Sequence, residues 1–294
     1  MRDAHAADGG PRPAKVSGAT VRGTSGNELY YDDTGGSGRP AVLIHGWPLN
    51  RRMWAPQTEA LAADGYRVIA YDRRGFGQSG QTLGGYDYDT LAADLAAVVE
   101  GLDLRDATLV GFSMGGGEVA RYLTNHGAAR VRGVVFASAV TPYLLKTDDN
   151  PDGPLGRTDV ARTAAALAAD RDRFFDGLTR DFYTAGDELR VTERVRRATL
   201  ELCHQSSTVA ALRTLAAHDT TDFRADVAKV DVPALVLHGD SDRRVPFEGS
   251  GRRTHEAIAG SELVLVEGGP HGVTVSHAHE VNRALLAFLS DRPS

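Results

Sequence analysis

The chain of 294 residues contains one cysteine, Cys203. A single cysteine cannot form an internal disulfide or a cysteine-rich metal site, and its scarcity suits a reducing compartment. The neighbouring His204 suggests a Cys–His pair, but consecutive residues of a helix point in different directions. We therefore predict that Cys203 is a buried structural thiol.

Three further features are missing from the sequence. No apolar run approaches the length of a membrane span. Residues 1–18 are rich in Ala, Asp, Gly and Pro, without the apolar core of a secretory signal. There is no excess of basic charge, since the formal net charge is −6 at pH 7. We expect a cytoplasmic protein with a disordered leader over residues 1–18 and with no nucleic-acid or membrane partner.

The rest of the chain has the composition of an ordinary globular protein, with 41% hydrophobic and 24% charged residues. Short apolar runs alternate with helix-length segments, which predicts an α/β fold with a mostly parallel, doubly wound sheet and helices on both faces. A short antiparallel pair is expected first, at 19–22 and 28–31. The expected later strands are 40–44, 66–71, 107–110, 131–137, 234–237 and 262–266, and the expected helices are 56–64, 88–101, 113–126, 249–259 and 276–289.

Residues 142–224 interrupt this alternation. A Pro/Gly/Asp-rich loop (147–157) is followed by helical stretches without a strand-like run. A helical insertion between two strands of a parallel sheet lies above their carboxyl ends, where such sheets bind ligands. We therefore predict a helical cap over 142–224, inserted after the sixth strand into a core formed by 19–141 and 225–294. A separate helical domain is the alternative, but the strand pattern that resumes at Val232 needs its earlier partners.

The most informative motif is Gly111-Phe112-Ser113-Met114-Gly115, between an apolar run and a helical stretch. A Gly-x-Ser-x-Gly at a strand-to-helix junction forces the serine into a sharp, strained turn that exposes its hydroxyl. Only residues as small as glycine fit two positions before and after it. The following helix directs free N–H groups toward a developing oxyanion. Ser113 is thus a candidate nucleophile.

A serine nucleophile needs a general base, and the base needs an orienting carboxylate. In a doubly wound sheet these partners come from loops after later strands, in the order Ser, Asp or Glu, His. His271 stands in a glycine-flanked loop before the final helix, so it is the predicted base. The loop after 234–237 offers Asp240 and Asp242. Asp240 directly follows Gly239 and suits local turn hydrogen bonds, so we choose Asp242 and keep Asp240 in reserve.

The oxyanion hole needs two backbone N–H groups, and we predict those of Trp47 and Met114. Trp47 lies in the loop that leaves the strand at 40–44, next to the nucleophile strand. His45 is expected to brace that loop by hydrogen bonding. The glycine-containing segment 72–79 lacks the residues of a P-loop or dinucleotide turn. We expect a structural turn there, whose arginines hold loops through carboxylates and carbonyls.

With these pieces placed, the chain resembles the α/β-hydrolase superfamily, and within it the cofactor-free bacterial haloperoxidases (perhydrolases) and related aryl esterases. The resemblance implies the α/β-hydrolase fold, Ser113 as nucleophile, Asp242 as acid, His271 as base, the amides of Trp47 and Met114 as oxyanion donors, and no cofactor or metal. It runs from about 18 to 289 and is carried by HGWPL (45–49), YDRRGFGQS (71–79), GYDYDTLAADL (85–95), LVGFSMGGGEVARY (109–122), LLKTDDNPDG (144–153), TDFRADV (221–227), DVPALVLHGDSDR (231–243) and EGGPHG (267–272).

The resemblance implies a serine hydrolase that cleaves small carboxylic esters through an acyl-enzyme. Hydrogen peroxide is an expected second acyl acceptor, giving perhydrolase and haloperoxidase side activity, and copies of the chain are expected to form a homo-oligomer. Lactones or amides are alternative substrates for the same triad, and a ligand-sensing module with slow turnover is an alternative of another class. The chain departs from the family at 218–220 and 273–276, where more polar or smaller residues imply an altered acyl-pocket wall.

Overall fold

The computed structural model describes residues 16–290. Most of the predicted leader therefore lies outside the described residues. The first strand, β1, begins at Ser17. Ser17 and Gly18, which we assigned to the leader, pair with Asp33 and Asp32 of the next strand. The leader prediction is thus wrong for these two residues, because strand pairing extends beyond the apolar alternation that begins at Ala19.

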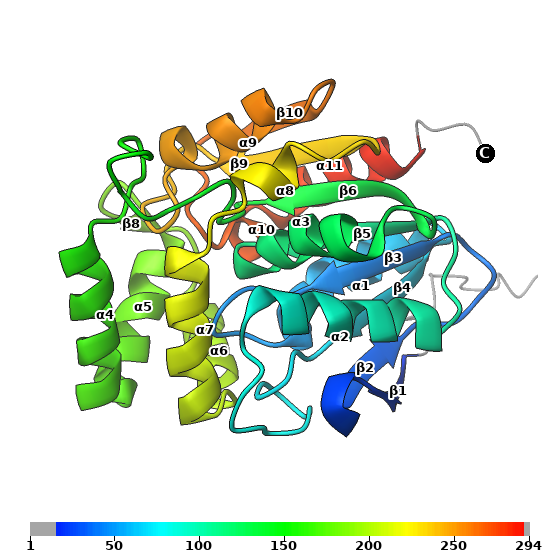
Figure 1. Ribbon diagram of the computed structural model, residues 1–294, viewed down its shortest axis with the longest axis horizontal. Coiled ribbons are helices and arrows are strands. Elements are labelled where there is room, and N and C mark those ends of the chain that lie inside the picture. The colour runs from blue at the N-terminus through cyan, green and yellow to red at the C-terminus, as the bar shows by residue number, and fades with distance from the viewer. Residues whose placement is uncertain (1–15, 291–294) are drawn as a thin grey trace, which may run out of the picture.

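An eight-stranded sheet forms the centre of the molecule, in the order β1-β2-β4-β3-β5-β6-β9-β10 (Figure 1). β1 pairs with β2, and β2 with β4, in antiparallel fashion, and every later pairing is parallel. The predicted mostly parallel sheet is confirmed. The strands are β1 (Ser17–Arg22), β2 (Glu28–Asp33), β3 (Pro40–Ile44), β4 (Arg67–Tyr71), β5 (Ala107–Phe112), β6 (Val131–Ala137), β9 (Ala234–Gly239) and β10 (Glu262–Val266).

Helices cover both faces of the sheet, because successive side chains of each buried strand point to opposite sides. On β3, Ala41 and Leu43 join one apolar cluster, while Val42 and Ile44 join the other. The helices of the core are α1 (Ala55–Ala63), α2 (Tyr88–Gly101), α3 (Met114–His126), α8 (Arg224–Val227), α9 (Gly251–Ala257), α10 (Val273–Ser276) and α11 (Ala278–Ser290), with 3₁₀ turns η1 (Thr24–Gly26), η2 (Arg51–Trp54) and η3 (Phe247–Gly249).

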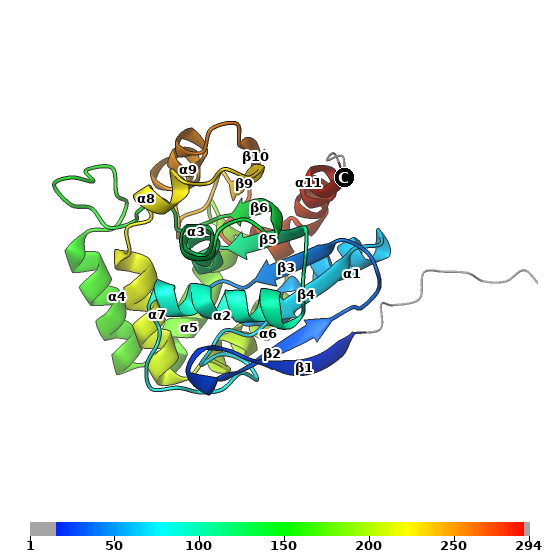
Figure 2. The same ribbon diagram turned by 45° about the vertical axis from the view of Figure 1, so that its right-hand side comes forward.

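The segment between β6 and β9, which we call the helical insertion (142–224), carries α4 (Arg157–Ala169), α5 (Arg171–Tyr183), α6 (Glu193–His204) and α7 (Thr208–Thr220). Figures 1 and 2 show these helices together at the end of the sheet toward which the parallel strands point. Polar side chains cap three of them, since Asp170, Thr192 and Ser207 each accept a hydrogen bond from a first-turn N–H.

The insertion is not purely helical. Two-residue strands, β7 (Thr184–Ala185) and β8 (Glu188–Leu189), pair between α5 and α6. Gly186, at φ 59°, supplies the left-handed residue of the tight turn that joins them. Such a short pair has no apolar run that a sequence pattern would reveal. Among the helices of residues 16–290, none combines the length and apolarity needed to cross a lipid bilayer.

Candidate active site

Ser113 occupies a strained turn between β5 and α3. Its backbone has φ 52° and ψ −116°, a conformation that non-glycine residues rarely adopt. A Cβ at Gly111 would lie 2.5 Å from the carbonyl oxygen of Gly115, and a Cβ at Gly115 would lie 2.5 Å from that of Ile44. Both flanking glycines are therefore required by close backbone contacts, as the motif predicted.

Three side chains from separate loops form a continuous polar chain in the structure. Ser113 Oγ lies 3.0 Å from His271 Nε2, and His271 Nδ1 lies 2.7 Å from Asp242 Oδ2. All three residues are at least nine-tenths buried. The distances suit a hydroxyl that donates to Nε2 while Nδ1–H donates to the carboxylate. The structure thus brings together the three residues that the sequence singled out from positions 113, 242 and 271.

The carboxylate of Asp242 is held by four groups. Its Oδ1 accepts hydrogen bonds of 2.9 Å from the backbone N–H groups of both Arg244 and Val245. Its Oδ2 lies 3.3 Å from Nε2 of the fully buried His238, in addition to the contact with His271. Burial alone would raise the pKa of Asp242, but the two imidazoles outweigh it and hold the pKa well below its usual value. Asp242 is therefore ionised at neutral pH.

His238 was not predicted to contact the acid. It is the fifth residue of β9, and the only sequence signal for its role is its i,i+4 spacing from Asp242. Asp240, the reserve acid, instead accepts hydrogen bonds from the backbone N–H of Gly268 and the hydroxyl of Ser241, at 2.8 and 2.9 Å. It belongs to the turn contacts that the sequence indicated.

The predicted oxyanion donors have free backbone N–H groups. Neither Trp47 nor Met114 donates a backbone hydrogen bond to any part of the chain between residues 16 and 290. Their loops touch, since a Cβ at Gly46 would lie 3.1 Å from the Cβ of Ser113. The indole N–H of Trp47 donates to the carbonyl of Ala211 in α7 over 2.9 Å, which fixes the side chain against the insertion.

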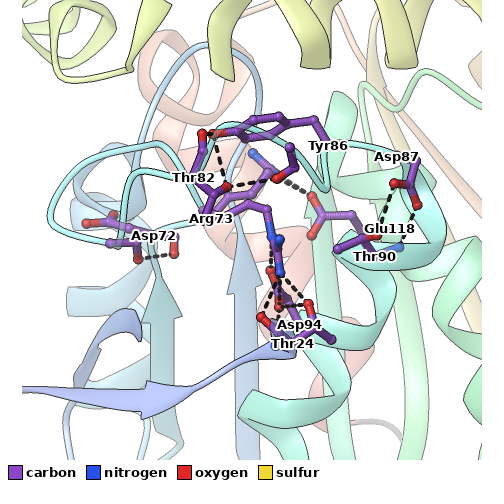
Figure 3. Close-up of polar contacts among 12 residues, drawn as sticks. Thr24, Asp72, Arg73, Thr82, Tyr86, Asp87, Thr90, Asp94 and Glu118 are labelled. Atoms are coloured by element: carbon purple, nitrogen blue, oxygen red, sulfur yellow. Dashed lines mark hydrogen bonds and ion pairs between the residues drawn. The ribbon is translucent and has the colours of Figure 1, made fainter. Parts of the chain in front are cut away.

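His45 braces the loop of Trp47, as expected. Its Nδ1 lies 2.9 Å from the carbonyl oxygen of Gly46, and its Nε2 accepts a 3.0 Å hydrogen bond from the backbone N–H of Arg73. The Arg73 guanidinium donates to the carbonyl of His45 over 2.7 Å and forms an ion pair with Glu118 (Figure 3). This buried network ties the loop to α3, which begins at the nucleophile turn.

Other arginines hold the same loops. Arg74 pairs with Asp94 of α2, and Arg51 pairs with Asp72, each at 2.6 Å. The expectation that arginines of segment 72–79 join loops through carboxylates and carbonyls is confirmed. Cys203 is also buried, and burial raises the pKa of its thiol well above the usual range, as expected for a structural residue.

His45 is expected to make the protein sensitive to mild acid. Burial, followed by the charge of Arg73, holds the pKa of His45 well below its usual 6.5. The unfolded chain then binds a proton that the folded chain does not, so stability falls as the pH drops below about 6.5. His45→Gln should lose about 2 kcal/mol less than the wild type between pH 7 and 5 in urea unfolding.

A matched control for this experiment is His279→Gln, which removes an exposed histidine from α11. It should keep the wild-type pH dependence. Equal losses of stability in the wild type and in His45→Gln would contradict the prediction.

A cavity of about 130 Å³ opens beside the serine. The core supplies Trp47, Ser113 and His271 to its wall, while the insertion supplies Phe182 of α5 and His218 of α7. The ring of Phe182 stands edge-on against the His271 imidazole, with centroids 4.8 Å apart and planes at 89°. Phe182 could not be predicted from the sequence, because no motif distinguishes it from other apolar residues of an amphipathic helix.

The two departures from the family pattern have different outcomes. His218 and Asp219 line the cavity of Ser113, so a more polar wall is present there. Residues 273–276 do not line it within the described chain. Thr274 and Val275 instead line a separate cavity of about 620 Å³, which shares Phe182 with the first. The expectation for 273–276 is wrong in that these residues belong to α10 and two of them line the neighbouring cavity instead. Within residues 16–290, no cluster of three His, Cys, Asp or Glu side chains is placed to hold a metal ion.

Comparison with known proteins identifies the family of the chain. Residues 40–278 match the family model described as the alpha/beta hydrolase fold. The chain is 41% identical to a non-heme chloroperoxidase from Kitasatospora aureofaciens, over 90% of this chain and 97% of the relative. It is 37% identical to a bifunctional esterase/perhydrolase from Acinetobacter calcoaceticus, over 90% and 96%.

A solved structure of a bromoperoxidase from Bacillus anthracis superimposes with a TM-score of 0.91 at 48% identity, covering 94% of this chain and 100% of that one. The chain therefore belongs to the α/β-hydrolase family. It is an enzyme with the α/β-hydrolase fold, and it is similar to non-heme haloperoxidases and esterases of that family.

Proposed function

We propose that this protein is a serine hydrolase that cleaves small carboxylic esters through an acyl-enzyme, with hydrogen peroxide as a second acyl acceptor. The polar chain from Ser113 Oγ through His271 to Asp242, with spacings of 3.0 and 2.7 Å, carries the proposal. The free N–H groups of Trp47 and Met114 beside it support the same reaction.

In the acylation step, Ser113 Oγ forms a bond to the ester carbonyl carbon while its proton passes to His271 Nε2. The carbonyl oxygen becomes an oxyanion that accepts hydrogen bonds from the amides of Trp47 and Met114. Each such donor contributes about 3 kcal/mol to transition-state stabilisation. Collapse of the tetrahedral intermediate breaks the ester C–O bond, and His271 returns the proton to the leaving alcohol. Asp242 stabilises the imidazolium that forms in between.

In the second step, water or hydrogen peroxide attacks the acyl carbon and gives its proton to His271. Collapse then breaks the bond to Ser113 Oγ, which takes the proton back. Water yields a carboxylic acid and peroxide yields a peracid. A released peracid oxidises bromide to hypobromous acid by two electrons and is itself reduced to the carboxylic acid. Halogenation therefore needs no halide site in the protein.

We also propose that the helical insertion (142–224) acts as a cap on the core formed by 19–141 and 225–294. The contact of Phe182 with the His271 ring and the hydrogen bond from Trp47 to Ala211 support this role. Cytoplasmic location is part of the proposal, since the buried thiol of Cys203 needs no oxidising environment. Assembly into a homo-oligomer stays a prediction.

The proposal is tested with p-nitrophenyl acetate, with and without hydrogen peroxide, and with bromination of monochlorodimedone followed in parallel. We expect steady turnover of the ester, and bromination only when ester or acetate, peroxide and bromide are all present. Mass spectrometry of a quenched reaction should find the acetyl group on Ser113. One slow turnover per protein molecule would instead favour the ligand-sensing alternative.

A further inference from the structure

The wall of the Ser113 cavity carries charged side chains beyond the proposed triad. Asp159 pairs with Arg162 at 2.6 Å, and the Asp219 carboxylate lies 3.0 Å from His218 Nδ1. Arg243 and Arg244 also line the cavity, but neither guanidinium forms an ion pair or hydrogen bond with any residue from 16 to 290. The two carboxylates therefore have partners and the two cations do not, so the uncompensated charge on this wall is positive.

Arg244 differs from the other shielded arginines near the site. Arg51, Arg73 and Arg74 are buried, and each pairs with a carboxylate. Arg244 is partly buried without such a partner. A cation that has lost part of its hydration without gaining a counter-ion is unfavourable, unless an anion occupies the site during function. A guanidinium is well suited to that anion if it is a carboxylate, because its planar fork matches both oxygens.

The position of Arg244 indicates where the anion would lie. Together with Leu178, Arg244 lines both the Ser113 cavity and a neighbouring cavity of about 460 Å³ along α4 and α5. Arg244 therefore lies between the space beside the serine and a second, larger space. A substrate that reaches both Ser113 and Arg244 needs a short chain between its ester carbonyl and its anionic end.

His218 provides a second polar contact in the same cavity. Its Nδ1 faces the Asp219 carboxylate at 3.0 Å, whereas its Nε2 is inaccessible to solvent and has no hydrogen-bond partner within residues 16–290. Its ring packs edge-on against the Trp47 indole, with centroids 5.5 Å apart, next to the loop of the proposed oxyanion donor. Buried polar groups in native proteins are nearly always hydrogen-bonded, so the unpaired Nε2 of this ring, in the wall of the Ser113 cavity, indicates a ligand group that pairs with it.

We propose that the preferred substrates are esters whose acyl part ends in a carboxylate, such as monoesters of short dicarboxylic acids. This proposal rests on the ester hydrolysis proposed above. The Arg244 guanidinium binds the terminal carboxylate, and an N–H of the His218 ring donates to an oxygen of the same acyl group. Arg243, exposed at the cavity mouth, adds to the local positive potential that attracts the anion.

The test compares two isosteric substrates. Monoethyl glutarate carries the carboxylate, and ethyl 4-carbamoylbutanoate replaces it with a neutral carboxamide. Hydrolysis of both is followed in a pH-stat, and the readout is the ratio of their kcat/KM values. For the wild type we expect a ratio of about ten or more in favour of the anion, the range of a charged hydrogen bond. The ratio should fall as salt is raised toward about 0.5 M, because ions screen the attraction.

Substitutions of Arg244 and His218 test whether these residues cause the preference for the anionic ester. Arg244→Met keeps the aliphatic stem and should bring the ratio close to one, mainly by raising KM for the anion. Arg244→Lys should keep part of the preference for the anionic substrate. Arg105→Met is the matched control, since it removes an exposed arginine that pairs with the surface residue Asp103, and it should keep the wild-type ratio. His218→Phe should also lower the ratio, because Asp219 is then left without its partner.

Failure of the anionic-substrate proposal can be distinguished from failure of the proposed ester hydrolysis. A wild-type ratio near one, or a ratio that Arg244→Met leaves unchanged, overturns the anionic-substrate proposal while p-nitrophenyl acetate is still hydrolysed. Loss of all ester turnover in the wild type would instead overturn ester hydrolysis itself, and with it this proposal. The salt dependence is measured on the wild type alone, so it tests the attraction even if a variant fails to fold.

Discussion

Replacing Ser113 by alanine is expected to lower kcat for p-nitrophenyl acetate by about 10⁶-fold, the size of effect seen when a serine nucleophile of a triad is removed. The alanine lacks the oxygen that forms the acyl bond, so water must attack the ester directly. Ala and Ser have similar tolerance for the φ of 52° at this position, so the thermal midpoint of unfolding should stay close to that of the wild type.

The matched control is Ser241→Ala, which removes a hydroxyl from the Asp242 loop at the same edge of the sheet. Its kcat should stay within about threefold of the wild-type value, because substitutions at the surface that do not touch the reacting groups have small effects. Turnover of Ser113→Ala within about tenfold of the wild type would refute the assignment of the nucleophile.

Asp242→Asn is expected to lower kcat by about 10⁴-fold. In the wild type, the Asp242 carboxylate accepts a hydrogen bond from His271 Nδ1–H, which leaves Nε2 unprotonated and able to take the serine proton. An asparagine amide can present an N–H to Nδ1 instead, which stabilises the wrong tautomer of the imidazole. The variant also lacks the negative charge that stabilises the imidazolium in the transition state. The loss should appear in kcat rather than in KM.

Asp240→Asn distinguishes this role from a general effect of the loop. Asp240 accepts a hydrogen bond from the Gly268 N–H, and an asparagine oxygen can accept the same bond. We expect kcat within about threefold of the wild type. A larger loss in Asp240→Asn than in Asp242→Asn would mean that the reserve acid is the functional one.

The features that sequence predicted well are those that local chemistry determines. Strands buried on both faces, such as β3 and β9, appear as continuous apolar runs because no position along them faces water. Gly111 and Gly115 mark the serine turn because no larger side chain fits its close backbone contacts. The order Ser, Asp, His follows from the parallel topology, which brings the loops after β5, β9 and β10 to one edge.

The features that it missed depend on tertiary contacts. Phe182 reaches the imidazole only because α5 lies over the loop of His271, and its own sequence neighbours carry no trace of that. His238 lies within a buried strand, where a histidine is equally consistent with a purely structural role. The family resemblance places residues 273–276 in the wall of the acyl pocket, yet they form α10, and Thr274 and Val275 line the neighbouring cavity.

The contact between Phe182 and His271 has a consequence for engineering. Replacing the helical insertion by that of another α/β-hydrolase is a direct way to change the wall of the Ser113 cavity. Here the grafted piece would bring a new neighbour for the imidazole itself, and would also remove the carbonyl of Ala211 that anchors the Trp47 indole. Chimeras of this enzyme should therefore be built with the helical insertion and the loops of Trp47 and His271 transferred as one unit.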